Sequence, residues 1–162
     1  MYFPREILVL AQVVSSFVVM LSAYAVTLML ILVSGYPLEP APVLMVPLAF
    51  VLSFVFATGV VMLFSSVSVY CRDVQHLLSS LGIAFFFATP NYFLLSETSG
   101  LLNQLIWINP FTYYVEMFHD LLYFGRVPET GMLCMTVLIT AITFVLGTAV
   151  FRRLKDGFAE RL

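Results

Sequence analysis

The sequence has 162 residues, enough for one domain, but 62% of them are apolar and only 10% are charged. A soluble domain carries about 25% charged and roughly 45–50% apolar residues, so this chain has too few charges to cover a surface in water. A net charge of −2, from 7 basic and 9 acidic residues, provides neither a basic field for nucleic acid nor an acidic tail. The composition predicts an all-α integral membrane protein and excludes nucleic-acid binding.

Four long stretches without charged residues predict four transmembrane helices. About 20 apolar residues cross the hydrocarbon core, and a charge at its centre costs at least ~2.5–3.5 kcal/mol. The first helix is expected to stop near Gly35, because three prolines follow it within a few residues. The expected spans are residues 8–33, 44–66, 76–96 and 131–151, within a single transmembrane domain over residues 1–162.

The distribution of basic residues predicts the orientation of these spans. Lys and Arg in short loops favour the cytoplasmic side of a membrane. With the N-terminus inside, Arg126 is external and the other six basic residues are cytoplasmic: Arg5, Arg72, Arg152, Arg153, Lys155 and Arg161. Both termini of this multi-pass protein are therefore expected in the cytoplasm.

Small residues recur at a spacing of four, which allows close approach of helices in lipid. The pairs are Ser53/Ala57, Thr136/Thr140 and Thr143/Gly147. They fit packing within the chain, and they also fit a subunit interface. Cys71 and Cys134 are expected at opposite ends of spans, too far apart for a disulfide.

The segment between the third and fourth spans is too polar for a full crossing and too apolar for an ordinary external loop. Residues 101–108 can form a short helix, Asn109 breaks it, and Pro110 can start a second helix over residues 111–124. This predicts an external helical hairpin over residues 98–125, amphipathic and re-entrant. Such a hairpin is tolerated only where its polar backbone is buried in protein or lines a wet cavity.

Half of the chain's aromatic residues lie between residues 85 and 124. One interpretation is an aromatic belt at the level of the lipid headgroups. The other is a ring-lined exit path, because aromatic faces with polar edges suit a partly apolar, partly hydroxylated cargo such as a sugar chain. The two interpretations can hold for different rings.

Two polar clusters have both a functional and a structural interpretation. Glu116, with His119 and Asp120 three and four residues later, marks either a functional site near the external face or a rim salt bridge. The turn between the second and third spans contains Arg72 and Asp73. These residues can dock a cytoplasmic partner, or they simply anchor the turn on the cytoplasmic side of the membrane, as the positive-inside rule describes.

The sequence shows no apparatus for catalysis. It has no Gly-rich phosphate loop with Lys-Ser or Lys-Thr, no cluster with metal-ligand spacing and no Gly-x-Ser-x-Gly elbow. No catalytic residue, cofactor or metal is therefore expected, and any ATP hydrolysis belongs to another protein.

Five segments stand out in chain order: Phe3-Pro4-Arg5-Glu6-Ile7-Leu8, Tyr70-Cys71-Arg72-Asp73-Val74, Phe86-Phe87-Ala88-Thr89-Pro90, Asn109-Pro110-Phe111 followed by Glu116 and Phe118, and the tail from Val150 to Glu160. Together they resemble the ABC-2 permeases, and most of all the branch that exports O-antigen, capsular polysaccharide or teichoic acid. The resemblance covers essentially the whole chain. One departure is His119, where relatives commonly carry Arg after Glu-x-Phe.

The resemblance implies six spans per subunit, a permease homodimer and a separate ABC ATPase subunit. Four spans are expected here, so the family's first two are expected to be missing, with Met1 an internal start or the edge of a truncated gene. The resemblance also implies roles for three groups of residues. They are an ATPase-coupling turn (Tyr70, Arg72, Asp73, Gln75), an external gate hairpin (Asn109, Pro110, Glu116, His119, Asp120) and aromatic residues along a glycan path (Phe87, Tyr92, Trp107, Tyr113, Tyr114).

The expected function is that of the membrane-spanning subunit of an ATP-driven exporter in the bacterial cytoplasmic (inner) membrane. Its expected cargo is a polyprenyl-linked polysaccharide that moves outward, with membrane lipid around the protein. The alternatives are a drug or small-lipid exporter of the same superfamily, a non-transporting membrane assembly protein and an intramembrane enzyme. The last would need paired carboxylates or metal ligands, and only Glu116, His119 and Asp120 come near that requirement.

Overall fold

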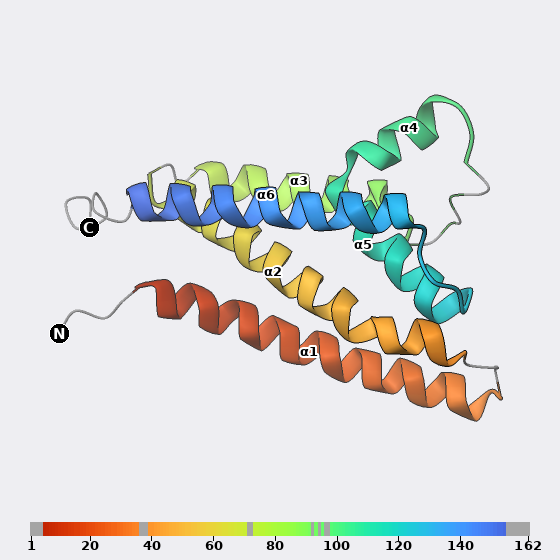
Figure 1. Cartoon of the computed structure of the whole chain (residues 1–162). Helices are drawn as coiled ribbons and strands as arrows, with labels where there is room; N and C mark the ends of the chain where they lie inside the picture. Colours follow the sequence, from red (N-terminus) through yellow and green to blue (C-terminus); the bar gives the residue numbers. More distant parts are fainter. Residues whose placement is uncertain are drawn as a thin grey trace.

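A computed structural model describes residues 5–35, 39–70, 73–91, 93, 95 and 98–154. All regular secondary structure in these residues is helical, as the sequence predicts (Figure 1). The described parts of the two termini lie at one end of the helices, and the two short helices α4 and α5 lie toward the other end (Figure 1).

Three helices are long and apolar enough to cross a membrane: α1 (Arg5–Val33), α2 (Pro40–Tyr70) and α6 (Thr130–Leu154). They correspond to the first, second and fourth spans expected from the sequence. The outward faces of α1 and α6 carry exposed Val, Leu, Ile and Met side chains. Such a surface is suited to lipid, because exposing this much apolar area to water would carry a large unfavourable free energy of hydration.

The third expected span differs from its expectation. Helix α3 (Asp73–Ala88) has 16 residues, about 24 Å of helix, whereas the hydrocarbon core is ~30 Å thick. It ends at Ala88 rather than near residue 96 because Pro90 has no N–H and disfavours helical geometry in the residue before it. The Thr89 hydroxyl donates to the Phe85 carbonyl at 2.6 Å, so this carbonyl in the last turn of α3 has a hydrogen-bond partner. A fourth crossing therefore remains a proposal.

Helices α2 and α6 lie side by side in Figure 1, and two glycines allow their backbones to touch. A Cβ atom on Gly59 would lie 2.7 Å from the Cα atom of Phe144, and a Cβ on Gly147 would collide with the carbonyl oxygen of Gly59. Thr136 and Thr140 are buried on α6 as well. The small residues expected on the fourth span therefore serve packing within the chain.

The buried core lies where α2 meets α5 (Pro110–Phe118) and the following π-helix η2 (His119–Tyr123). Met117 and Leu121 are each 1% exposed, although they belong to a segment expected near the membrane surface. Phe50 of α2 meets Tyr24 of α1 edge-on at 4.8 Å between ring centroids, and meets Phe118 at 5.3 Å. Apolar residues of the hairpin are therefore part of the core of the domain.

Candidate functional site at the helical hairpin

The hairpin consists of α4 (Leu101–Ile108), α5 and η2, and Asn109 forms its corner. Asn109 is 4% exposed. Its side-chain oxygen accepts a hydrogen bond from the Phe111 N–H at 3.0 Å, which caps α5, and Pro110 occupies the first helical position. The sequence prediction of a helix break at Asn109 followed by a second helix is confirmed.

The other end of the Asn109 amide ties the hairpin to α3. Its Nδ2 donates to the Thr89 hydroxyl at 2.8 Å and to the Phe85 carbonyl at 3.1 Å. Since Phe85 and Thr89 lie at the end of α3, the corner of the hairpin is anchored where that helix stops. One amide thereby both caps α5 and links it to α3.

A buried hydroxyl links α5 to α6. The Tyr114 hydroxyl and the Thr140 hydroxyl lie 2.6 Å apart, and Thr140 donates to the Thr136 carbonyl at 2.7 Å. The ring of Tyr114 stacks on Phe56 of α2 at 4.5 Å between centroids. Tyr114 therefore fixes α5 to two long helices, and its placement in the core favours a structural role.

The π-helix η2 ends in a tight loop closed by an ion pair. Arg126 donates through Nε to the Asp120 Oδ1 at 2.7 Å, its Nη2 forms an ion pair with the same oxygen at 2.7 Å, and its backbone N–H donates to the Asp120 carbonyl at 2.9 Å. Its guanidinium also lies 4.8 Å from the centroid of Phe124. Gly125 between them has φ +59°, a conformation that glycine adopts without strain.

Removing Arg126 is expected to destabilise this loop. The Asp120 side chain is 8% exposed whereas that of Arg126 is 64% exposed, so Arg126→Ala would leave a buried carboxylate without its cation. We expect a loss of about 1–3 kcal/mol, below the 3–5 kcal/mol of a fully buried pair because half of this pair faces solvent. Thermal unfolding of the purified chain would measure it, with Arg126→Lys as the matched variant that keeps the charge. Equal stability of the alanine variant and the wild type would contradict this role.

The Glu116 and His119 pair forms as the sequence suggests, with 3.2 Å between Nδ1 of His119 and Oε1 of Glu116. Asp120 does not join this pair, because it binds Arg126 instead. The three residues therefore form two separate contacts on one helix. Among the described residues, no group of three His, Cys, Asp or Glu side chains is arranged to hold a metal ion.

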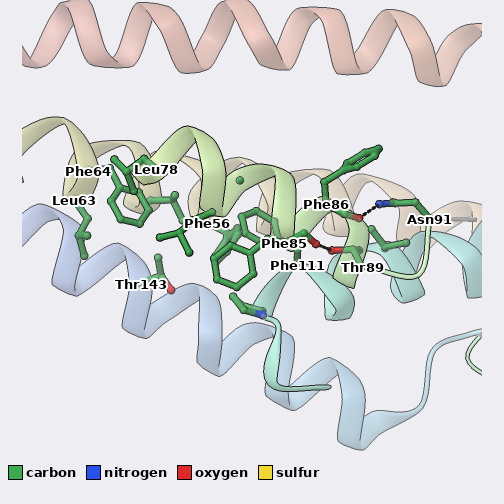
Figure 2. A pocket seen from close by; sticks show the side chains of 15 residues that line it. Phe56, Leu63, Phe64, Leu78, Phe85, Phe86, Thr89, Asn91, Phe111 and Thr143 are labelled. Atoms are coloured by element: carbon green, nitrogen blue, oxygen red, sulfur yellow. Dashed lines mark hydrogen bonds between the residues drawn. The ribbon is translucent and has the colours of Figure 1, made fainter. Parts of the chain in front are cut away.

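An apolar groove of about 590 Å³ lies between α2, α3, α5 and α6, next to the hairpin corner (Figure 2). Figure 2 shows the rings of Phe56, Phe85 and Phe111 together in it, with Thr89 and Asn91 at one end. The groove can hold hydrocarbon, because most of its lining is apolar. The lining residues are Phe56, Val60, Leu63, Phe64, Leu78, Leu81, Gly82, Phe85, Phe86, Thr89, Asn91, Pro110, Phe111, Val115 and Thr143.

A second cavity, of about 470 Å³, also borders the hairpin. Its lining is mixed and more apolar than polar, but four charged side chains line it, and we call it the polar cavity. Its walls include the carboxylates of Glu116, Asp120 and Glu129, the guanidinium of Arg126 and the indole of Trp107. Helix α5 therefore lines both cavities, with Phe111 and Val115 facing the groove and Glu116 facing the polar cavity.

The aromatic residues expected along a glycan path are not all brought to one place. Trp107 lines the polar cavity and meets Tyr113 edge-on at 5.1 Å between centroids. Phe87 is 69% exposed and lines neither of these two cavities, and Tyr92 lies outside the described residues. Phe56 and Phe64 of α2 line the groove without having been singled out, because a Phe within a long apolar span carries no distinguishing signal.

The expected ATPase-coupling turn falls largely beyond what the structure describes. Arg72 and Cys71 lie outside the described residues, and Tyr70, Asp73 and Gln75 are described only by their place at the ends of α2 and α3. Their role therefore stays a prediction.

Sequence reasoning missed the partner of Asp120. Arg126 was noticed only as the single external basic residue, although its distance of six residues from Asp120 across a glycine offered a signal for a closed loop. Gly59 was also missed, because the residues four positions away in its helix, Val55 and Leu63, are not small.

Comparison with known proteins identifies the family. The model of the ABC-2 type transporter family matches residues 1–123, so the chain belongs to this family. No solved structure matches the chain.

Two curated relatives are similar over almost the entire chain. The O-antigen export system permease protein RfbA of Myxococcus xanthus is 24% identical over 165 residues, which cover 99% of this chain and 62% of the relative. A protein of the same name from Klebsiella pneumoniae is 24% identical over 160 residues, 99% of this chain and 61% of the relative. The chain thus spans about three fifths of the length of both relatives.

Proposed function

We propose that the chain is a membrane-spanning part of an ATP-driven exporter that moves a polyprenyl-linked polysaccharide outward across the bacterial cytoplasmic membrane. In this proposal α3 is a crossing too and brings their number to four, both termini are cytoplasmic, and the hairpin of α4, α5 and η2 is a re-entrant gate on the external side. An ABC ATPase subunit supplies the energy, and a second permease subunit completes a homodimer.

The observation that carries the proposal is that one short helix, α5, lines two cavities of different character, of which one is lined almost entirely by apolar residues and the other also by four charged side chains. Phe111 and Val115 face an apolar groove, and Glu116 faces a cavity walled by carboxylates and a guanidinium. A cargo with a hydrocarbon part and a hydroxylated part needs both kinds of surface next to each other. The relatives named for O-antigen export support the same cargo class.

Deleting the gene from its native cells tests the proposal. We expect surface polysaccharide to disappear and polyprenyl-linked glycan to accumulate inside the cell, and we expect expression of the chain to reverse both changes. Polysaccharide would be followed by gel staining and the lipid-linked glycan by mass spectrometry. Unchanged polysaccharide together with increased sensitivity to drugs would replace the proposal by the drug-exporter alternative.

The double variant Arg72→Ala and Asp73→Ala is expected to uncouple ATP hydrolysis from export. A turn this short is too small to form a domain but can dock on a partner, and this one carries a basic and an acidic residue side by side in the sequence. The complex would be purified by a tag on the chain, and ATPase activity and polysaccharide export would be measured together. Glu39→Gln, in the loop before α2, is the matched control for loss of a loop charge. Normal coupling in the double variant would remove this role from the turn.

A further inference from the structure

We infer that the polar cavity beside the hairpin is a binding site for a sugar residue that is uncharged or carries an amine. This inference rests on the proposed function and names the chemistry of one contact with its cargo. The cavity is bounded by the end of α4, by α5 and η2, and by the start of α6, with a volume of about 470 Å³. A pyranose ring presents a C–H face that an aromatic ring can contact and hydroxyls that charged side chains can hydrogen-bond, and the cavity has residues of both kinds.

The aromatic face comes from Trp107. This side chain is half-buried at the end of α4, and its contact with Tyr113 is edge-on, with an interplanar angle of 61°. Tyr113 can cover at most one of the two faces of the indole. The C–H face of a sugar ring can lie against the other, which contributes apolar contact while the hydroxyls remain free.

The hydrogen-bonding groups come from two different segments. The Asp120 and Arg126 pair is joined by two hydrogen bonds and an ion pair, and the guanidinium lies over the ring of Phe124. Glu129, next to the start of α6, is exposed, and no side chain among the described residues pairs with its carboxylate. A fixed guanidinium with a nearby accepting carboxylate suits adjacent hydroxyls, one accepting and one donating.

The charge balance of the cavity selects among possible ligands. Glu116, Asp120 and Glu129 contribute three carboxylates against one guanidinium from Arg126. This excess of negative charge disfavours phosphate, sulfate and acidic sugars, because like charges in a partly enclosed space repel. Neutral hexoses and amino sugars remain.

Trp107 is the chain's single tryptophan, so its fluorescence reports directly on this cavity. The full chain, purified into lipid nanodiscs, would be titrated with mannotriose and with maltotriose. We expect at least one of them to change the Trp107 emission saturably, with a Kd on the order of 1 mM. Mannose 6-phosphate is expected to produce no saturable change.

Glu129→Gln is the test variant, because the residue is exposed and its replacement leaves the buried ion pair intact. We expect about fivefold weaker sugar binding, because the hydrogen bond to a charged carboxylate becomes a weaker one to a neutral amide oxygen. Glu39→Gln removes an exposed carboxylate outside the cavity and is expected to bind as the wild type does. Thermal unfolding would establish that both variants are folded.

Three outcomes would overturn the inference. They are no fluorescence change with either trisaccharide, equal binding by Glu129→Gln and the wild type, and a saturable response to ethanolamine as strong as that to the sugars. The measurement needs neither ATP nor export, so it fails or succeeds independently of the gene deletion. Loss of export on deletion without sugar binding would reject the site alone, and sugar binding without an export defect would reject the proposed function alone.

Discussion

Gly147→Ala is expected to destabilise the chain more than the same substitution at Gly131, the other glycine of α6. The new Cβ atom would collide with the carbonyl oxygen of Gly59, which is backbone and cannot rotate away as a side chain can. Helices α2 and α6 would have to separate, at a cost of about 1–3 kcal/mol for overpacking. This cost exceeds the gain in helix propensity of about 0.8–1 kcal/mol that alanine brings.

Gly131→Ala is the matched control, because it changes the same residue type in the first turn of the same helix. Nothing lies within 4 Å of a Cβ at Gly131, so we expect unchanged or slightly raised stability. Unfolding of both variants in mixed micelles, followed by circular dichroism, compares them directly. Equal stability of the two variants would show that α2 and α6 do not touch at Gly59.

Asn109→Ala is expected to release the hairpin corner from α3. The variant loses the cap of α5, worth about 1 kcal/mol, which leaves the Phe111 N–H without its partner. It also loses the bonds to the Thr89 hydroxyl and the Phe85 carbonyl, which keep the hydrogen bond between them. A net hydrogen bond contributes about 0.5–1.5 kcal/mol, so the total loss should be about 2–3 kcal/mol. Hydrogen exchange should rise in α4 and in the first turn of α5 while α2 and α6 stay protected.

Two further variants separate the functions of this amide. Asn109→Asp keeps an oxygen for the cap and loses the donor to Thr89, so its exchange should rise mainly at the contact with α3. Asn91→Ala removes an asparagine whose hydrogen bond stays within its own segment, to the Phe86 carbonyl at 3.0 Å. If Asn91→Ala loosened the hairpin as much as Asn109→Ala, the corner would not depend on Asn109.

These contacts determine which parts of the hairpin can move independently. Asn109 ties its corner to α3, Tyr114 ties α5 to α6, and the Asp120 and Arg126 pair closes the loop that leads into α6. A gate in this position would have to break or carry along each tie. The Asn109 contact is the one of these three that reaches the end of α3, about 20 residues away in sequence. A rearrangement of α3 would therefore break it first.

Much of the architecture follows from composition and local chemistry. The three long helices were predictable because apolar stretches longer than a bilayer allow only helical backbone in lipid. The hairpin corner was predictable because Asn-Pro both ends one helix and begins the next. The Glu116 and His119 contact was predictable because residues three apart share a helix face.

Other features depended on contacts between distant segments. The end of α3 at Ala88 follows from the nearby Pro90, but the hydrogen bonds from the Asn109 amide to the Thr89 hydroxyl and the Phe85 carbonyl form only when the hairpin folds back. The roles of Tyr114 and Gly59 depend on which side of α2 faces α6, and an almost uniformly apolar helix carries no pattern that reveals it.

The sequence by itself therefore determined that the chain is helical, that lipid surrounds it and which three stretches form the long helices, because those properties depend on residues close together in the chain. Only the tertiary structure decided which rings are core and which line a cavity, and that Asp120 binds Arg126 rather than His119. In a membrane, apolar side chains face lipid and protein alike, so hydrophobicity cannot tell the two apart. The pairing of helices is then set by shape, by small residues and by a few buried hydrogen bonds.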